Sequence, residues 1–96
     1  MTDFEVFAVP QGVDEVLKQE LARQFERYGL DVPTCRLVGS QKNTLIEIVA
    51  TPKRAQREIR FLVPMEDIAL GDFSQLIEDA LEMNGYEVRP RVAKAP

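Results

Sequence analysis

The chain lacks the side chains on which most small enzymes and metal sites depend. Its 96 residues include no histidine, no tryptophan and one cysteine. Without histidine, the commonest general base and the usual partner of a serine or cysteine nucleophile are missing. A structural zinc site needs four nitrogen or sulfur ligands, which Cys35 alone cannot supply. We therefore expect no metal, no cofactor and no enzymatic activity.

Long hydrophobic runs and glycine-rich loops are also missing. No segment approaches the roughly 18 apolar residues of a membrane-spanning helix. The first residues, Met-Thr-Asp-Phe-Glu, are acidic where a secretory signal would be basic. The five glycines are scattered, so there is neither a phosphate-binding loop nor a dinucleotide fingerprint. Together with the single cysteine, these features predict a cytoplasmic chain that has no membrane partner and no nucleotide-dependent chemistry.

Length and hydrophobic content are those of one small globular domain. Apolar residues make up 45% of the chain, which is a usual fraction for a protein with one core. We expect residues 1–93 to form this domain and residues 94–96 to be a disordered tail.

Charge is sorted by segment, although the formal net charge is only −4. Residues 64–87 contain seven acidic and no basic side chains, whereas residues 34–63 contain six basic and two acidic side chains. Blocks of opposite sign favour a polarised surface and electrostatic association with a partner. The charge pattern is the strongest functional signal in this sequence.

Two stretches have the hydrophobic period of an amphipathic helix. The first covers residues 13–28, and the pair Gly29 and Leu30 indicates a Schellman-type end. The second follows Asp72, which we expect to cap it, and ends at Gly85. Its apolar stripe predicts a buried face that consists of Phe73, Leu76, Ile77, Ala80 and Leu81.

Five segments have the composition of strands. They are residues 4–9, 35–38, 44–51, 58–63 and 86–92. A four-residue loop at 53–56 places two apolar sets on one face of the sheet, namely Ile46, Ile48 and Ala50 with Ile59, Phe61 and Val63. Thr51 and Pro52 are also typical of a helix start, so a helix over residues 52–63 stays open as an alternative.

The element order β-α-β-β-β-α-β predicts an α+β fold. Each amphipathic helix needs a sheet face to cover its stripe, which favours a two-layer sandwich. We expect a mixed, mostly antiparallel sheet of about five strands with both helices on one face. The charged side chains expected on the outward face are Arg36, Glu47, Arg60, Arg89 and Arg91. The apolar outward positions are Leu45, Val49 and Leu62.

Glu78, Asp79 and Glu82 form the densest acidic group, on the expected exposed face of the second helix. Such a group can present an acidic surface to a basic protein partner. The alternatives are an ordinary solvated helix face and a divalent cation site. Adjacent helical positions do not converge on one ion, so a protein partner is the stronger functional interpretation.

Lys42, Lys53, Arg54 and Arg57 lie on or beside two expected turns. They are candidates for phosphate contacts, and Arg36 and Arg60 would extend the same patch over the sheet. The alternative is that they keep the turns solvated. No aromatic side chain interleaves them for base stacking, which weakens a nucleic-acid interpretation.

The single thiol and one glycine complete the candidate sites. Cys35 alternates with Leu37, so we expect a buried structural residue rather than a nucleophile. Gly12 precedes the first helix, where backbone donors can hold an anion. In outline, residues 4–51 resemble small ferredoxin-like and ACT-type ligand-sensing domains, and that resemblance implies a small-ligand site at Gly12.

A second resemblance concerns the succession of helix, three strands and helix. This order is similar to that of double-stranded-RNA-binding domains and implies RNA binding. The second helix is basic in that family and acidic in this chain.

The sequence as a whole predicts a small non-catalytic protein-interaction or regulatory module. It would act through the acidic helix or the mixed-charge sheet face, with a protein partner or by self-association as a homodimer. Phages and mobile elements carry many small acidic chains of this kind, which makes such an origin one interpretation. The alternative functions are small-ligand sensing by a ferredoxin-like domain and nucleic-acid binding through the basic hairpins.

Overall fold

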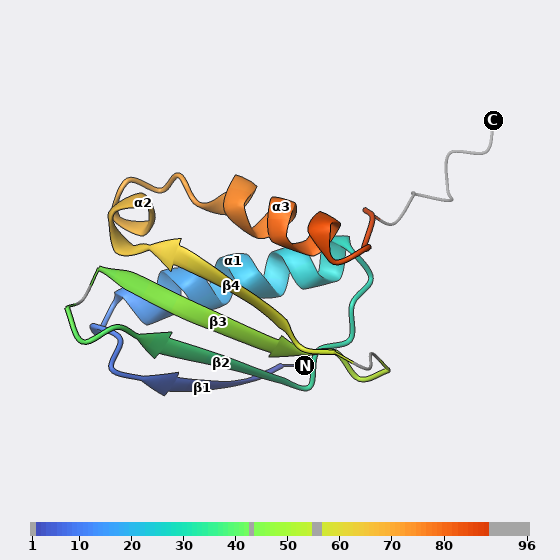
Figure 1. The fold of residues 1–96 in the computed structure, drawn as a ribbon, viewed down its shortest axis with the longest axis horizontal. Coiled ribbons are helices and arrows are strands. Elements are labelled where there is room, and N and C mark those ends of the chain that lie inside the picture. The colour runs from blue at the N-terminus through green and yellow to red at the C-terminus, as the bar shows by residue number, and fades with distance from the viewer. Residues whose placement is uncertain (1, 43, 55–56, 89–96) are drawn as a thin grey trace.

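Four strands form one sheet, in the order in which they occur along the chain (Figure 1). The computed structural model describes residues 2–42, 44–54 and 57–88. The strands are β1 (Asp3–Phe7), β2 (Thr34–Gly39), β3 (Leu45–Thr51) and β4 (Ile59–Pro64). β1 is parallel to β2, and the other two neighbouring pairs are antiparallel. The parallel pair is joined by a helix, because a short turn cannot connect two parallel strands.

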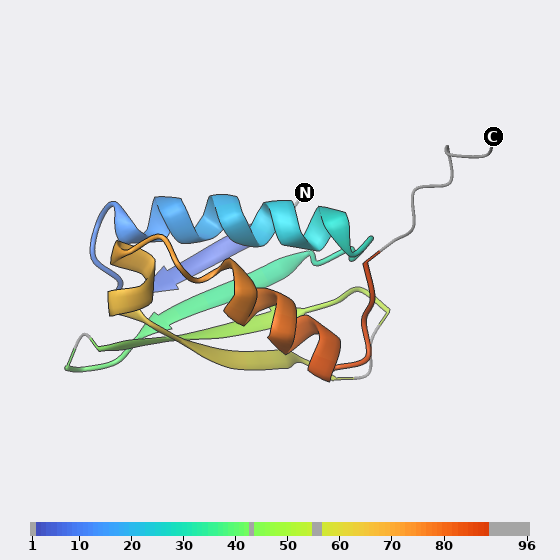
Figure 2. The same ribbon diagram turned by 90° about the horizontal axis from the view of Figure 1, so that it is seen from above.

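Three helices complete the fold, and the α+β class is confirmed. They are α1 (Val13–Arg27), α2 (Met65–Ala69) and α3 (Ser74–Met83). Figure 2 shows α1 and α3 running beside each other along the sheet. Leu17 and Leu21 of α1 are fully buried, as are Ile77 and Leu81 of α3. These side chains share one apolar core with the inward side chains of the strands, so one face of the sheet is covered.

The predicted register of the last two strands is confirmed. Ala50 is paired with Ile59, Ile48 with Phe61 and Ile46 with Val63. Three strands thus contribute alternate side chains to the core, and the opposite side chains face outward. The strand interpretation of residues 58–63 is correct, and the helical alternative for that segment is wrong.

Glycine ends both long helices in the predicted manner. Gly29 has a φ of 66° and its N–H donates to the carbonyl of Glu26 at 3.0 Å, while the N–H of Leu30 donates to the carbonyl of Phe25 at 2.8 Å. This pair of bonds is a Schellman motif. Gly85 ends α3 with the same pattern: its N–H donates to the carbonyl of Glu82, and the N–H of Tyr86 donates to the carbonyl of Leu81.

Three expectations about the second half of the chain are wrong. In the described residues the sheet has four strands and not five, because Tyr86–Val88 is not a strand. The rest of the strand predicted at residues 86–92 lies outside the described residues. The short helix α2 was not expected. Phe73 is the N-cap of α3 and makes no side-chain capping bond, so Asp72 does not have the capping role predicted for it. Arg89, Arg91 and the expected tail at 94–96 also lie outside the described residues.

The connection from β1 to α1 crosses closely over the end of β2. Ala8 has a φ of 57°, in the left-handed region that non-glycine residues seldom adopt. A Cβ atom on Gly39 would lie 2.0 Å from the carbonyl oxygen of Ala8. Gly39 is therefore required where the backbone of the β1–α1 loop meets β2.

Candidate functional site

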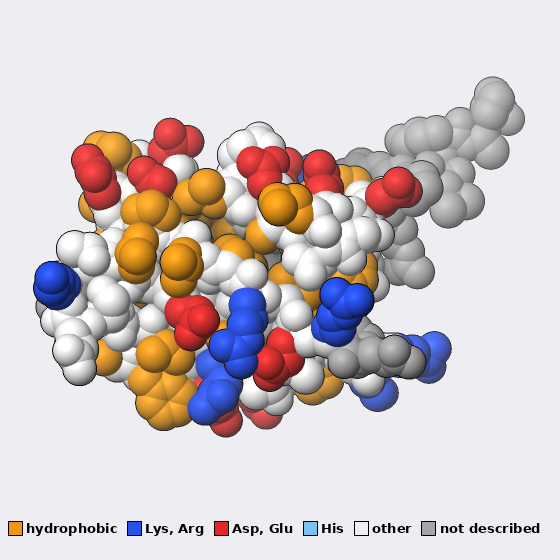
Figure 3. All heavy atoms as spheres, viewed as in Figure 1, with side chains coloured by type: hydrophobic (Ala, Val, Ile, Leu, Met, Phe, Trp, Pro, Cys, Tyr) orange, Lys and Arg blue, Asp and Glu red, His pale blue; other side chains and the backbone are white. Residues whose placement is uncertain are grey.

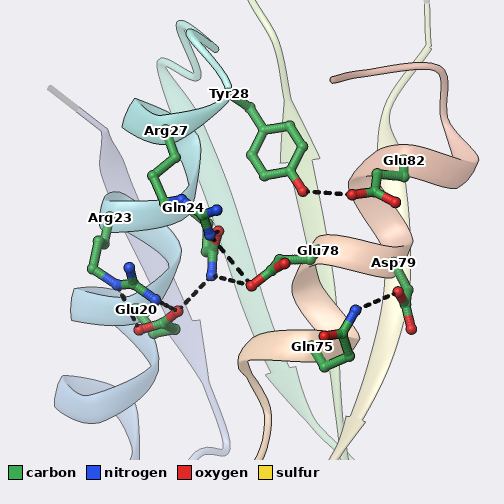
Figure 4. A network of polar contacts seen from close by, with 9 residues as sticks. All are labelled: Glu20, Arg23, Gln24, Arg27, Tyr28, Gln75, Glu78, Asp79 and Glu82. Atoms are coloured by element: carbon green, nitrogen blue, oxygen red, sulfur yellow. Dashed lines mark hydrogen bonds and ion pairs between the residues drawn. The ribbon is translucent and has the colours of Figure 1, made fainter. Parts of the chain in front are cut away.

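The predicted acidic group does not form a free surface, because α1 packs beside α3. Glu78 Oε2 accepts hydrogen bonds from the side chains of Gln24 and Arg27, both at 3.3 Å (Figure 4). Glu82 accepts a hydrogen bond of 3.1 Å from the hydroxyl of Tyr28. Asp79 is exposed and bonds only to its own helix in the described contacts, through the amide of Gln75. Two of the three carboxylates thus join the helices to each other.

Gln24 is the centre of this network. It is fully buried, and its amide donates to Glu20 at 2.7 Å and to Glu78 at 3.3 Å. Its carbonyl oxygen accepts from Arg27 at 2.9 Å. Burial alone would raise the pKa of Glu20, but hydrogen bonds from Arg23 and Gln24 outweigh it and lower the pKa below its ordinary value. A buried amide with all of these partners fixes how the two helices pack.

The predicted phosphate contacts lie at opposite ends of the sheet. Lys42 is in the β2–β3 turn, whereas Lys53, Arg54 and Arg57 are in the β3–β4 connection. Lys53 and Arg54 line a groove of about 380 Å³, and Asp31 is another of its lining residues. The four cations therefore do not form one continuous patch.

Gly12 and Cys35 are both engaged within the fold. The N–H of Gly12 donates to the carboxylate of Asp14 at 3.0 Å, so a carboxylate of the chain already occupies the place proposed for a ligand. Asp14 and Glu15 also make the first turn of α1 acidic. Cys35 is fully buried on the inward face of β2, and burial raises the pKa of its thiol to about 12. At neutral pH this thiol is protonated and is not a nucleophile.

The outward face of the sheet is the remaining candidate, and Figure 3 looks onto it. We call it the open face; the strand pairing aligns its side chains in two rows across all four strands. The charged row is Glu5, Arg36, Val49 and Arg60. The apolar row is Phe7, Val38, Glu47 and Leu62. Hydrophobic side chains lie beside basic and acidic ones on this face (Figure 3).

The charges of the open face are paired with each other. Arg36 lies 3.5 Å from Glu5, and Arg60 lies 3.5 Å from Glu47 and 3.1 Å from Glu58. Exposed pairs of this kind contribute little to folding stability. Between the two arginines, Val49 is only 3% exposed although it points outward. Arg36 and Arg60 are its neighbours in the row, and their aliphatic stems are long enough to cover it.

The apolar row exposes two large side chains. Phe7 is 46% exposed and Leu62 is 54% exposed, at opposite edges of the sheet. The guanidinium of Arg36 lies 5.7 Å from the centre of the Phe7 ring, within the range of a cation–π contact. Between the two edges, Val38 is half-buried, as are Leu45 and Pro64 next to the row. Glu47 separates Val38 from Leu62, so this end of the face has exposed apolar side chains at both edges and a carboxylate between them.

Most of this surface agrees with the outward positions expected from the sequence. Arg36, Glu47 and Arg60 lie on the open face, as do the apolar positions, although Val49 is covered there. Glu5 and Phe7 were not anticipated, because the parallel pairing of β1 with β2 could not be read from the sequence. The alternation in Phe4-Glu5-Val6-Phe7 was the available signal, since it puts Glu5 and Phe7 on one side of a strand.

Comparison with known proteins gives no relative from which a role could be transferred. No family model matches the chain, and no curated protein or solved structure matches it significantly. Within residues 2–42, 44–54 and 57–88, no three acidic or cysteine side chains gather in a way that could hold a metal ion. None of the helices described is long and apolar enough to cross a membrane.

Proposed function

We propose that this chain is a non-catalytic protein-interaction module that binds its partner through the open face of the sheet. The observation that carries the proposal is the exposure of Phe7 and Leu62 in one row, beside the paired arginines of the next row. Single exposed apolar residues are common, whereas several apolar side chains that share one face with charged ones are typical of a binding surface. Aromatic and arginine side chains are also enriched at protein interfaces.

Three hydrogen bonds favour the sheet face over the acidic helix. Glu78 and Glu82 already accept hydrogen bonds from α1, so a partner would have to displace internal bonds to reach them. Asp79 alone is a small target. The acidic group accordingly contributes to the packing of the helices in this proposal, and the partner contacts lie on the strands.

The charge of the open face also favours a protein over a nucleic acid. Its arginines, Arg36 and Arg60, lie against three carboxylates, those of Glu5, Glu47 and Glu58. A phosphate backbone would meet more negative than positive charge there. A protein surface can match both signs. The module would work in the cytosol, where the thiol of Cys35 stays reduced.

Site-specific photo-crosslinking in an extract of the native host tests the proposal. A benzophenone amino acid is placed at Phe7 or Leu62, and at Leu70 as the control. Leu70 is 72% exposed and lies at the end of α2, away from the strands. We expect protein adducts from positions 7 and 62 and none from position 70. Equal adducts from all three positions, or none from positions 7 and 62, would contradict the proposal. Nucleic-acid adducts would instead favour the basic hairpins.

A further inference from the structure

The two edge strands of the open face, β1 and β4, are complementary to each other under one particular rotation. When two copies face each other about a twofold axis parallel to the strands, each row lies over the same row of the other copy in reversed strand order. β1 then lies over β4 of the second copy, and β2 over β3. The register places Glu5 over the second copy's Arg60, and Phe7 over its Leu62. At the two edges of the sheet, charge thus meets opposite charge and an apolar side chain meets an apolar side chain. In the middle, Arg36 lies over Val49 and Val38 lies over Glu47.

Other twofold arrangements do not give this match. An axis perpendicular to the strands and lying between the rows places each strand over itself, so Glu5 would lie over Phe7, and Arg60 over Leu62. An axis through the charged row would place Glu5 over Glu5 and Arg60 over Arg60, which is repulsive. An axis through the apolar row would place Phe7 over Phe7 but also Glu47 over Glu47. Of these axes, only the one parallel to the strands places Glu5 over Arg60.

Distances across a sheet sandwich are compatible with this pairing. Packed sheets lie about 10 Å apart, and their strands cross at about 30°. The edge strands lie roughly 7 Å from the axis, so this crossing displaces facing residues by about 4 Å along the strands. Glutamate and arginine side chains are long enough to meet across that offset. Phe7 and Leu62 are large enough to remain in contact.

We infer that the open face binds a second copy of this chain, in a face-to-face homodimer with β1 over β4 of the partner. The inference rests on the proposed function and specifies the partner for that surface. Four strands about 4.8 Å apart and about 20 Å long give a face of roughly 400 Å² for each copy, or about 800 Å² in total. Stable interfaces bury roughly 1,200–2,000 Å². The dimer is therefore weak and depends on concentration.

Charge-reversal variants at positions 5 and 60 test the proposed pairing of Glu5 with the second copy's Arg60. Glu5→Arg and Arg60→Glu each turn both intermolecular pairs of the homodimer into like-charge pairs. An equimolar mixture of the two variants restores both pairs in a heterodimer. By sedimentation equilibrium up to about 1 mM, we expect each variant alone to associate about tenfold more weakly than the wild type. The mixture should associate within threefold of the wild type.

Asp79→Arg is the matched control for Glu5→Arg, because it makes the same charge change at an exposed position of α3. It should associate like the wild type. Unchanged association of both Glu5→Arg and Arg60→Glu would overturn the inference, as would a mixture that associates no better than either variant. A folded wild-type chain that stays monomeric up to about 1 mM would overturn it as well.

A second measurement avoids charge variants, in case these do not fold. The benzophenone probe at Phe7 is activated in a mixture with an isotopically labelled copy of the wild-type chain. Mass spectrometry should find adducts to the labelled β4 strand, around Leu62. The same measurement is repeated with host extract added to the mixture. Adducts from positions 7 and 62 to a different protein, with none to the labelled chain, would refute the homodimer and keep the proposed function. Adducts to no protein would refute both.

Discussion

Gly39→Ala tests the close crossing of the β1–α1 loop over β2. The added Cβ would lie 2.0 Å from the carbonyl oxygen and 2.9 Å from the carbonyl carbon of Ala8, where ordinary contacts begin near 3.4 Å. Both atoms belong to the backbone, so the loop must move by more than an ångström. Overpacking of this kind costs about 1–3 kcal/mol, and a clash with backbone belongs at the upper end of that range. Alanine also reduces the conformational freedom of the unfolded chain, which offsets about 0.5 kcal/mol of this cost.

The expected loss is thus about 2–3 kcal/mol, from a total stability of about 5–14 kcal/mol for a chain of this length. For a domain of this size it lowers Tm by about 10–20 °C, measured by circular dichroism. Gly71→Ala is the matched control: its φ is 73°, and no atom lies within 4 Å of the added Cβ. It should cost about 1 kcal/mol, from the left-handed backbone alone. If the Tm of Gly39→Ala equals that of the wild type, or exceeds that of Gly71→Ala, the β1–α1 loop does not cross β2 as closely as described.

Three further predictions concern the covered side of the sheet. Leu81→Ala should cost about 2–5 kcal/mol in chemical denaturation, because Leu81 is fully buried; an unchanged midpoint would mean that α3 does not pack there. Cys35 should react with a thiol reagent at pH 8 only after unfolding, since burial raises its pKa to about 12; stoichiometric labelling within seconds of the native chain would contradict this. Burial and the hydrogen bond to Glu82 raise the pKa of Tyr28 from 10 to about 12. The stability that the protonated Tyr28 contributes should therefore be complete below pH 10 and be lost as pH rises toward 12. In the Tyr86→Phe variant, where Tyr28 is the only tyrosine, a phenolate midpoint near pH 10 would exclude this.

The long helices and the register were predictable because local chemistry determines them. The stripe through Leu17 and Leu21, and the glycine at position 29, specify α1 without reference to any other segment. The β3–β4 register follows from the requirement that Ile46 and Ile48 share a face with Val63. In both cases the correct structure is the one that buries the apolar set.

The errors arose where the structure depends on contacts between distant segments. α2 has only five residues and one buried side chain, Ile68, so it has no period to detect. Tyr86 and Val88 alternate with polar residues as in a strand, but they follow the end of α3 without pairing.

The candidate site depended even more on tertiary contacts. A helical wheel places Glu78 toward solvent, and only the neighbouring helix supplies Gln24 and Arg27, which lie more than fifty positions earlier in the chain. The outward positions of β2 to β4 followed from alternation. Glu5 and Phe7 joined them only through the parallel pairing of β1, which the α1 crossover determines.

The edge position of β1 gives the open face a local stability of its own. Among the strands of the described residues, β1 pairs with β2 alone, and the inward side chains of β1, Phe4 and Val6, are only partly buried. All residues of the buried core described lie after β1 in the chain. β1 can therefore detach while that core remains closed, and its amide hydrogens should exchange faster than those of β2 and β3. Each such opening removes Glu5 and Phe7 from the surface, so the free energy of this local opening sets the fraction of molecules that are competent to bind.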